Sequence, residues 1–431
     1  MKAFTRREFL KGTLTVGGAA CCSAAFGSLG SRIAYAQSMG GNGKIFVVIH
    51  LDGGNDWHQS FDVAHTTSAR AAYEQVHPVS QINPNLILPT ANGYGFHPSL
   101  AGLHQIYQAG DVRVMRRVGT LSPSRSHDQE QLKFENGDFS SNGLGWMGRV
   151  MDGVARQGGN VSRFMTMAIG QGNPIDIQGA SVRGLGLRDL TAYGLNSQSG
   201  VGSDQAYRQY IAQQVTNAVQ PTTPITASVK DGQRAMYQSI ETLQDAAGSF
   251  TGRGLSANPT LGAQYPTQSP GPQLRQIAML IQAGLGTQLA LCGMGGFDLH
   301  SAIGNENGSE ANLMRNLDRA LIAFRNDMVA MGKWNDVVIA IDSEFGRTIQ
   351  ENGSAGVDHG ESIALVMLGG AISGGVSGSP VTGDEFFRNN RRPNWIRVEH
   401  HYANAYEEVL AWAGLPSNVF ASHPSHNFNL L

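Results

Sequence analysis

The sequence predicts a three-layer α/β sandwich, in which helices cover both faces of a mainly parallel central sheet. Two observations support this fold class. Four short apolar runs, bounded by glycine or polar residues, have the character of buried strands and lie at residues 45–51, 112–118, 289–294 and 337–341. Segments of helical periodicity alternate with them, and strands that alternate with helices are typical of parallel sheets.

The predicted helices follow from the spacing of apolar residues. The clearest lie at about residues 228–247, 273–283, 311–331 and 403–413. In the third of these, one helical face carries Leu313, Leu317, Leu321 and Phe324. Between residues 184 and 272 the composition shifts to Gln, Ser, Thr, Gly and Pro. We interpret this stretch as an insertion in the α/β domain, although an ordinary loop-rich part of the same domain is an equal alternative.

The N-terminus has the features of a twin-arginine export signal. Arg6 and Arg7 precede an apolar pair and a lysine, and a weakly hydrophobic run then leads to Ala34-Tyr35-Ala36, an A-x-A cleavage site. Glycine and serine residues make the run too polar for a membrane span. We therefore expect residues 1–36 to be a signal peptide that the twin-arginine machinery recognises, and residues 37–431 to form a periplasmic domain.

Net charge, the lengths of the apolar runs and the number of cysteines indicate which classes of partner and which sources of stability to expect. The formal net charge of −2 over 431 residues is nearly balanced, and no basic stripe is interleaved with aromatic residues, so we expect no nucleic-acid partner. No later apolar run is long enough for a transmembrane helix, so we expect no integral membrane span after cleavage. Cys292 is the one cysteine of the mature chain, because Cys21 and Cys22 lie in the signal. Stability must then come from a packed core rather than from an internal disulfide.

Acidic and histidine residues follow the predicted strands. Because ligands of parallel sheets bind beyond the carboxyl ends of the strands, these positions are candidates for function. The candidate metal ligands are Asp52, Asp56, Asp298, His300, Asp342 and Glu344, together with His359 in the loop before the apolar run at 363–368. Such oxygen and nitrogen donors suit one or two ions of Zn²⁺, Mn²⁺, Mg²⁺ or Ca²⁺, and clustered carboxylates repel one another without a cation.

Ser126 lies before a predicted helix at 128–136, beyond the strand at 112–118. Free backbone amides and the dipole at a helix N-terminus favour an anion or an alkoxide, so the hydroxyl of Ser126 is a candidate nucleophile. Serine is also a preferred N-cap residue. The equal alternative is therefore a plain cap, with His127 on the surface.

Several motifs together resemble the DUF1501 family of exported bacterial proteins, which is related to the alkaline phosphatase and sulfatase superfamily. The matching stretches are FVVIHLDGGND, GFHPSLAGLHQIYQAGDVRVMRRVG, SRSHDQEQLKFENG, GWMGR, GGFDLHS, SEFGRTIQENGSAGVDHG and LVMLGGAISGGVSG. They span nearly the whole mature chain. The resemblance implies an alkaline phosphatase-like fold with a metal-assisted ester hydrolase site at one edge of the sheet.

The resemblance also implies roles for individual residues. Asp298, His300 and His359 resemble the Asp and two His that hold one metal in that superfamily. The second set would comprise Asp52 or Asp56, Asp342 or Glu344, and Ser126 as nucleophile. Arg347 or Arg125 would steady a phosphate or sulfate oxygen by a forked contact.

Two departures from the superfamily pattern affect this expectation. Asp342 is followed by Ser343 and Glu344 rather than by the usual histidine, so a second site would hold a hard ion, hold a metal weakly or be empty. Cys292 lacks the sulfatase Cys-x-Pro-x-Arg context, so a formylglycine nucleophile is unsupported. The sequence thus predicts hydrolysis of small-molecule or polymer phosphate or sulfate esters. The alternative is a non-catalytic, metal-stabilised module for envelope binding or surface-polymer assembly.

Overall fold

The computed structural model describes residues 42–139, 143–190, 239–240, 242–250, 264–386 and 395–431. The predicted signal peptide, residues 1–36, lies outside these ranges. Most of the predicted insertion, at 191–238 and 251–263, lies outside them as well. Of the helix predicted at 228–247, only residues 239–240 and 242–247 are described, and these are helical.

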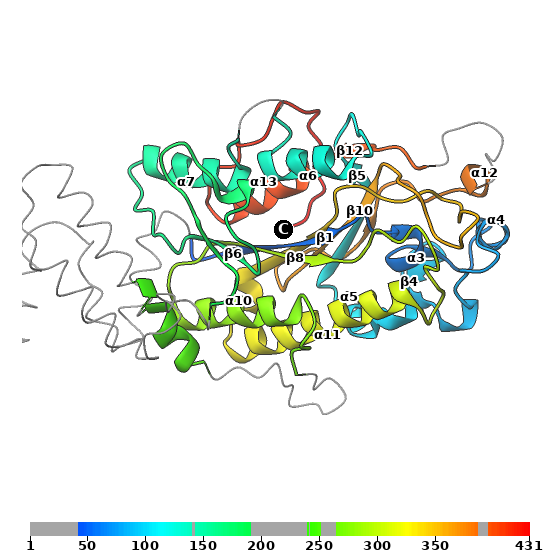
Figure 1. Ribbon diagram of the computed structural model, residues 1–431, viewed down its shortest axis with the longest axis horizontal. Helices are drawn as coiled ribbons and strands as arrows, with labels where there is room; N and C mark the ends of the chain where they lie inside the picture. Colours follow the sequence, from blue (N-terminus) through cyan, green and yellow to red (C-terminus); the bar gives the residue numbers. More distant parts are fainter. Residues whose placement is uncertain (1–41, 140–142, 191–238, 241, 251–263, 387–394) are drawn as a thin grey trace, which may run out of the picture.

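A nine-stranded sheet forms the centre of the protein (Figure 1). Its strands lie in the order β11-β5-β10-β9-β1-β8-β6-β7, with β12 paired to β5. Their bounds are β1 (Ile45–Asp52), β5 (Val112–Gly119), β6 (Thr166–Ile169), β7 (Leu185–Leu187), β8 (Leu289–Gly295), β9 (Val337–Asp342), β10 (Ile363–Leu368), β11 (Gly375–Ser377) and β12 (His400–His401). The four predicted strands and the apolar run at 363–368 all belong to this sheet.

Helices cover both faces of the sheet, which confirms the predicted three-layer α/β class (Figure 1). One face carries α6 (His127–Asn136), α7 (Trp146–Arg156) and α13 (Ala403–Trp412); the other carries α5 (Ala101–Gln108), α10 (Gly271–Ala283) and α11 (Ser309–Ala330). In β1, Val47 and Ile49 belong to the core on the α10–α11 side, whereas Phe46 and Val48 belong to the core on the α7–α13 side. Because successive side chains of a strand alternate between faces, His50 points toward the α6–α7–α13 layer.

Smaller elements lie beside one end of the main sheet. A three-stranded sheet has the order β2-β4-β3 and is accompanied by short helices. The bounds are β2 (Val63–Ala64), β3 (Leu88–Pro89), β4 (Tyr94–Phe96), α3 (Trp57–Ser60), α4 (Arg70–Val76), α12 (Gly383–Phe386), and the 3₁₀ helices η2 (Pro84–Leu86) and η3 (Pro98–Leu100). Two further 3₁₀ helices lie elsewhere: η4 (Ile175–Ile177) contacts α6 and α7, and η5 (Trp334–Asp336) directly precedes β9. No helix in the described part of the chain is long and apolar enough to cross a membrane.

One antiparallel strand decides where the loops meet. β1 is parallel to both β8 and β9, but β10 is antiparallel to its neighbours β9 and β5. The N-terminal end of β10 therefore lies at the same edge as the carboxyl ends of β1, β5, β8 and β9. The loop that precedes β10, with Asp358 and His359, consequently reaches the edge where the loops after those strands gather.

Candidate metal centre

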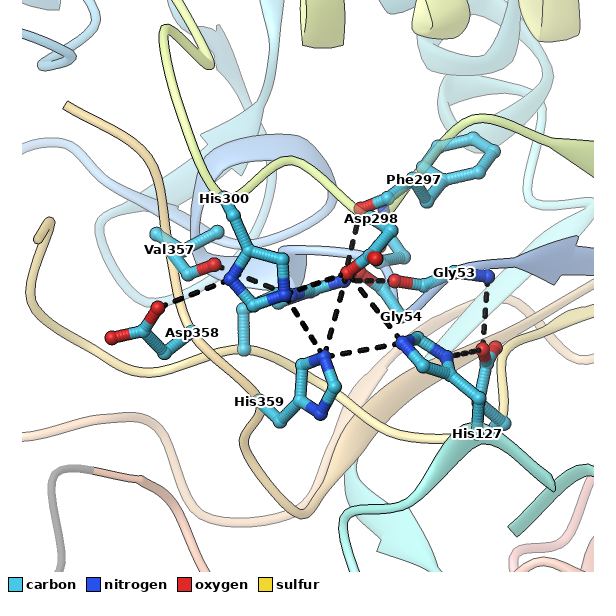
Figure 2. A network of polar contacts seen from close by, with 12 residues as sticks. Gly53, Gly54, His127, Phe297, Asp298, His300, Val357, Asp358 and His359 are labelled. Atoms are coloured by element: carbon cyan, nitrogen blue, oxygen red, sulfur yellow. Dashed lines mark hydrogen bonds and ion pairs between the residues drawn. The ribbon is translucent and has the colours of Figure 1, made fainter. Parts of the chain in front are cut away.

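Three of the predicted ligands meet at this edge of the sheet. Asp298 and His300 lie in the loop after β8, and His359 lies shortly before β10. Nε2 of His300 is 2.9 Å from Oδ1 of Asp298 and 3.0 Å from Nε2 of His359. Nε2 of His359 is 3.4 Å from Oδ1 of Asp298. Figure 2 shows these side chains pointing toward a common centre.

His127 joins this group, although its place in the sequence suggested only a surface histidine. It is the first residue of α6, and its Nε2 is 3.1 Å from Nε2 of His359 and 3.5 Å from Oδ1 of Asp298. Ligand atoms of His127, Asp298 and His359 all lie within 4.8 Å of one another, which suits a metal ion. We call the four residues His127, Asp298, His300 and His359 the His–Asp cluster. The sequence did contain a sign of this role. His127 lies in the segment after the predicted strand at 112–118, and the other members of the cluster also lie in segments next to predicted strands.

Each histidine of the cluster is oriented by its other ring nitrogen. The three Nδ1 atoms face oxygen acceptors: Oε1 of Glu344 at 2.7 Å for His127, Oδ1 of Asp358 at 3.1 Å for His300, and the carbonyl oxygen of Arg125 at 2.9 Å for His359. An Nδ1–H group that donates to oxygen leaves Nε2 with its lone pair in the neutral ring. This arrangement is the usual one for histidines that bind metals through Nε2.

A divalent cation fits this donor set. Tetrahedral coordination with ligand bonds near 2 Å places neighbouring donor atoms about 3.3 Å apart. Nε2 of His359 and Oδ1 of Asp298 lie 2.9 to 3.5 Å from each other and from Nε2 of His127 and His300. Burial lowers the pKa of His359, and the positive charges of Arg347, His127 and His300 lower it further, which favours the neutral imidazole. Neutral Nε2 atoms at such distances repel one another, and a cation between them removes the repulsion.

Arg347 and a glycine pair hold the loops around the cluster in place. The side chain of Arg347 has no exposed surface, and its guanidinium donates to Oδ1 of Asp298 at 2.6 Å and to the carbonyl oxygen of Gly54 at 2.8 Å. It also donates to the carbonyl oxygen of Gly53. Gly53 has φ +116°, and a Cβ there would lie 2.5 Å from the backbone nitrogen of Asp298. Only glycine permits this close approach of the loops after β1 and β8.

Glu344 connects the cluster to a second polar group under α13. Its Oε1 accepts from Nδ1 of His127 and, at 2.9 Å, from the backbone N–H of Gly53. Burial by itself raises the pKa of Glu344, but His50 and His127 outweigh burial and lower it to about 2. His50 in turn lies 2.8 Å from Oδ1 of Asp342, which also accepts from the hydroxyl of Tyr406 at 2.5 Å through Oδ2. Glu344 thus orients His127 of the cluster, whereas Asp342 orients His50 outside it, and the role of either acid as a metal ligand stays a prediction.

Asp52, the last residue of β1, and Asp56, in the loop after it, lie in surroundings of their own. Asp52 is exposed, and its Oδ1 accepts from Nε2 of Gln131 at 2.6 Å. Asp56 is buried, and its Oδ1 caps α3 by accepting from the backbone N–H of His58 at 3.1 Å. Burial raises the pKa of Asp56 to about 7. No described contact joins either carboxylate to a member of the cluster, so their role as ligands stays a prediction.

The predicted nucleophile and anion-binding arginines have distinct surroundings. Ser126 is the N-cap residue of α6, but its side chain makes no capping hydrogen bond. The hydroxyl is therefore not committed to the cap, and its role as nucleophile stays a prediction. The guanidinium of Arg125 lies 3.8 Å over the ring of Trp395. Arg347 has no exposed side-chain surface, and its role in binding a substrate oxygen stays a prediction.

Replacing Glu344 by glutamine should weaken metal binding about 10- to 100-fold, the usual effect of changing a group that orients a ligand histidine. Glutamine keeps the shape but removes the charge that raises the basicity of His127. A competition titration with a chromogenic chelator measures the affinity. Glu74→Gln on α4, which alters an exposed i,i+4 pair with Arg70, is the matched control. Unchanged affinity in Glu344→Gln would show that His127 does not depend on this carboxylate.

Solved structures similar to this chain include three enzymes of low identity. They are the PsFucS1 sulfatase from Pseudoalteromonas sp. (12% identity, 83% of this chain and 70% of that chain, TM-score 0.32), the phosphonate monoester hydrolase SpPMH from Silicibacter pomeroyi (11%, 90% and 75%, 0.29), and the lipoteichoic acid synthase LtaP from Listeria monocytogenes (8%, 90% and 78%, 0.29). No curated protein matches the chain.

A family model described as "Protein of unknown function (DUF1501)" matches residues 116–391. The match includes the second half of β5, the whole of α6 with His127, the loop after β8 and the segment from β9 to β10. It therefore contains all four members of the His–Asp cluster. This chain belongs to the DUF1501 family.

Proposed function

We propose that this chain is a periplasmic metal-dependent hydrolase of phosphate or sulfate esters. One observation carries the proposal: three histidine Nε2 atoms and one carboxylate oxygen converge, while each histidine is held by an acceptor at Nδ1. Such a donor set suits Zn²⁺ or Mn²⁺ better than Ca²⁺, which prefers oxygen ligands. The residues would bind the ion through Nε2 of His127, His300 and His359 and through Oδ1 of Asp298.

The chemistry of the site follows from these residues and from α6. A divalent ion bound there would polarise an ester oxygen and lower the pKa of a bound water. Arg347 holds Asp298 and the Gly53–Gly54 backbone in position. The free backbone N–H groups at the start of α6 favour negative charge beside Ser126. Asp298 has about half of its side chain exposed, so a substrate can approach the cluster from solvent.

Metal analysis combined with a substrate panel tests the proposal. Protein purified from the periplasm should contain about one equivalent of a divalent metal and should cleave at least one aryl phosphate, phosphodiester or aryl sulfate. Chelation should abolish turnover, and the ion should restore it. Absence of metal in protein exposed to Zn²⁺ and Mn²⁺ would overturn the proposal. A full equivalent of metal without turnover on any ester would favour the non-catalytic envelope module.

Substitution of Ser126 by alanine separates a nucleophile from a helix cap. If the hydroxyl attacks the ester, the variant should lose most of its turnover with little change in Tm, because the hydroxyl acts in the transition state. Loss of a cap instead costs about 1 kcal/mol of stability. Because the side chain makes no capping bond, we expect the first result. Ser122→Ala, which changes an exposed serine of the same loop, is the control and should keep full turnover. Turnover of Ser126→Ala within a few-fold of wild type would exclude Ser126 as nucleophile.

Replacement of Arg6 and Arg7 by lysine should abolish periplasmic delivery, because the export receptor reads the arginine pair. The folded domain should be unaffected, since the cluster and both cores lie in residues 42–431. Cell fractionation measures the distribution, and a lysine substitution at Arg156 serves as a control for the loss of an arginine. Full delivery of the double variant would remove the basis for the twin-arginine route.

A further inference from the structure

A cavity of about 390 Å³ lies between β1, β8 and the α6–α7 layer, and none of the four members of the His–Asp cluster lines it. Its lining includes His50, Asp52, Phe134, Glu135, Trp146 and Asp176. The position follows from the alternation of β1, whose His50 and Asp52 point to the same face as Val48. On β8, Gly293 and Gly295 line the cavity without side chains to fill it. We call this space the acidic cavity.

Two carboxylates of the acidic cavity, Asp176 and Glu135, feel the positive charge of His50, but among the described residues neither forms an ion pair. Asp176, in η4, is 6% exposed, and apart from its own backbone N–H no described residue donates a hydrogen bond to it. Glu135 lies at the C-terminal end of α6, where the helix dipole disfavours negative charge, and no described residue donates to it either. Buried carboxylates are normally paired or hydrogen-bonded, because desolvation of an unpaired charge is costly.

The positive charge near these acids is that of His50, which already interacts with Asp342 and Glu344. Burial lowers the pKa of His50, but Asp342 and Glu344 outweigh burial and raise it well above the usual range. The charge of His50 is therefore shared between Asp342 and Glu344. Burial raises the pKa of Asp176 to about 8, and the charge of Glu135 adds to this rise. Because burial and the charge of Glu135 disfavour the ionised form of Asp176, a ligand cation in the cavity would stabilise that form.

We propose that the acidic cavity binds an organic cation, an aliphatic ligand that carries a primary ammonium group. An ammonium donates three hydrogen bonds, which suits Asp176 and Glu135, and the apolar rings of Phe134 and Trp146 line the cavity beside them. A metal ion fits less well, because the one metal-type group found among the described residues is in the His–Asp cluster. The volume also exceeds that of a single ion and suits a small organic molecule.

Putrescine and 1,4-butanediol, tested on the mature chain at about 0.15 M salt, provide a matched pair of probes of equal length. Calorimetric titration should give saturable binding of the diamine and none of the diol. Asp176→Asn and Glu135→Gln should each weaken binding at least about tenfold, the ratio expected for loss of a charge-assisted hydrogen bond. Asp384→Asn, an exposed acid on α12, should leave binding unchanged.

Three outcomes would overturn the proposal: equal binding of diol and diamine, diamine binding that neither cavity variant alters, or Asp176-dependent binding of Mg²⁺ or Ca²⁺ alone. Since Asp176→Asn removes a buried group, its Tm is measured, and the half-buried Glu135→Gln supplies an independent test. A His359→Ala variant should bind putrescine like wild type. The inference therefore stands or fails separately from the proposed ester hydrolysis.

Discussion

Replacing His359 by alanine should reduce the bound metal from about one equivalent to less than about a tenth. Nε2 of His359 lies within 3.4 Å of the donor atoms of His127, His300 and Asp298, so it is in contact with every other member of the cluster. Its removal leaves three donors, two of them exposed by nearly half of their side chains. Metal content by mass spectrometry after dialysis measures the effect.

His359→Ala should also differ from wild type in how its thermal stability responds to added metal. A ligand present at a hundred times its Kd stabilises a native protein by about 2.7 kcal/mol, so wild type should gain several degrees in Tm when the ion is added. His359→Ala should gain nothing. The control is His65→Ala, which changes a partly exposed histidine after β2, far from the cluster in sequence. Retention of metal and of the Tm increase by His359→Ala would refute the cluster as the metal site.

Replacing Arg347 by methionine should destabilise the native state by about 3–5 kcal/mol, the range typical of removing one partner of a buried charged network. The guanidinium is completely buried and donates to the carbonyl oxygens of Gly53, Gly54, Val357 and Phe297 as well as to Asp298. Methionine fills similar volume but donates nothing, so these carbonyl groups lose their partner. Equilibrium unfolding in urea measures the difference.

Arg156→Met on α7 is the matched control, because Arg156 is exposed, and its replacement should change stability by less than about 0.5 kcal/mol. Arg347→Met should also weaken metal binding, since Asp298 loses the contact that orients its Oδ1 and lowers its pKa. A stability like that of the control would mean that the loops after β1 and β8 hold their positions without this side chain.

Local sequence patterns determined most of the fold. The apolar runs correspond to β1, β5, β8, β9 and β10, and the helical periods correspond to α6, α10, α11 and α13 within a few residues. These elements are readable because burial imposes a period of two or 3.6 residues on apolar side chains, and that period is a local property. The Asp-x-His and Asp-His pairs were equally readable, since they stand directly at strand ends.

Contacts between distant segments were decided only by the tertiary structure. The antiparallel direction of β10 brings His359 to the edge reached by Asp298, and nothing in the run at 363–368 specifies that direction. The role of His127 depends on Glu344, which is more than two hundred residues away in the chain. The sequence left Asp342 and Glu344 open as alternative ligands, and only the structure shows that Asp342 contacts His50 and Glu344 contacts His127. Such choices depend on three-dimensional packing, and a single sequence records residue types and their spacing but not which distant side chains become neighbours.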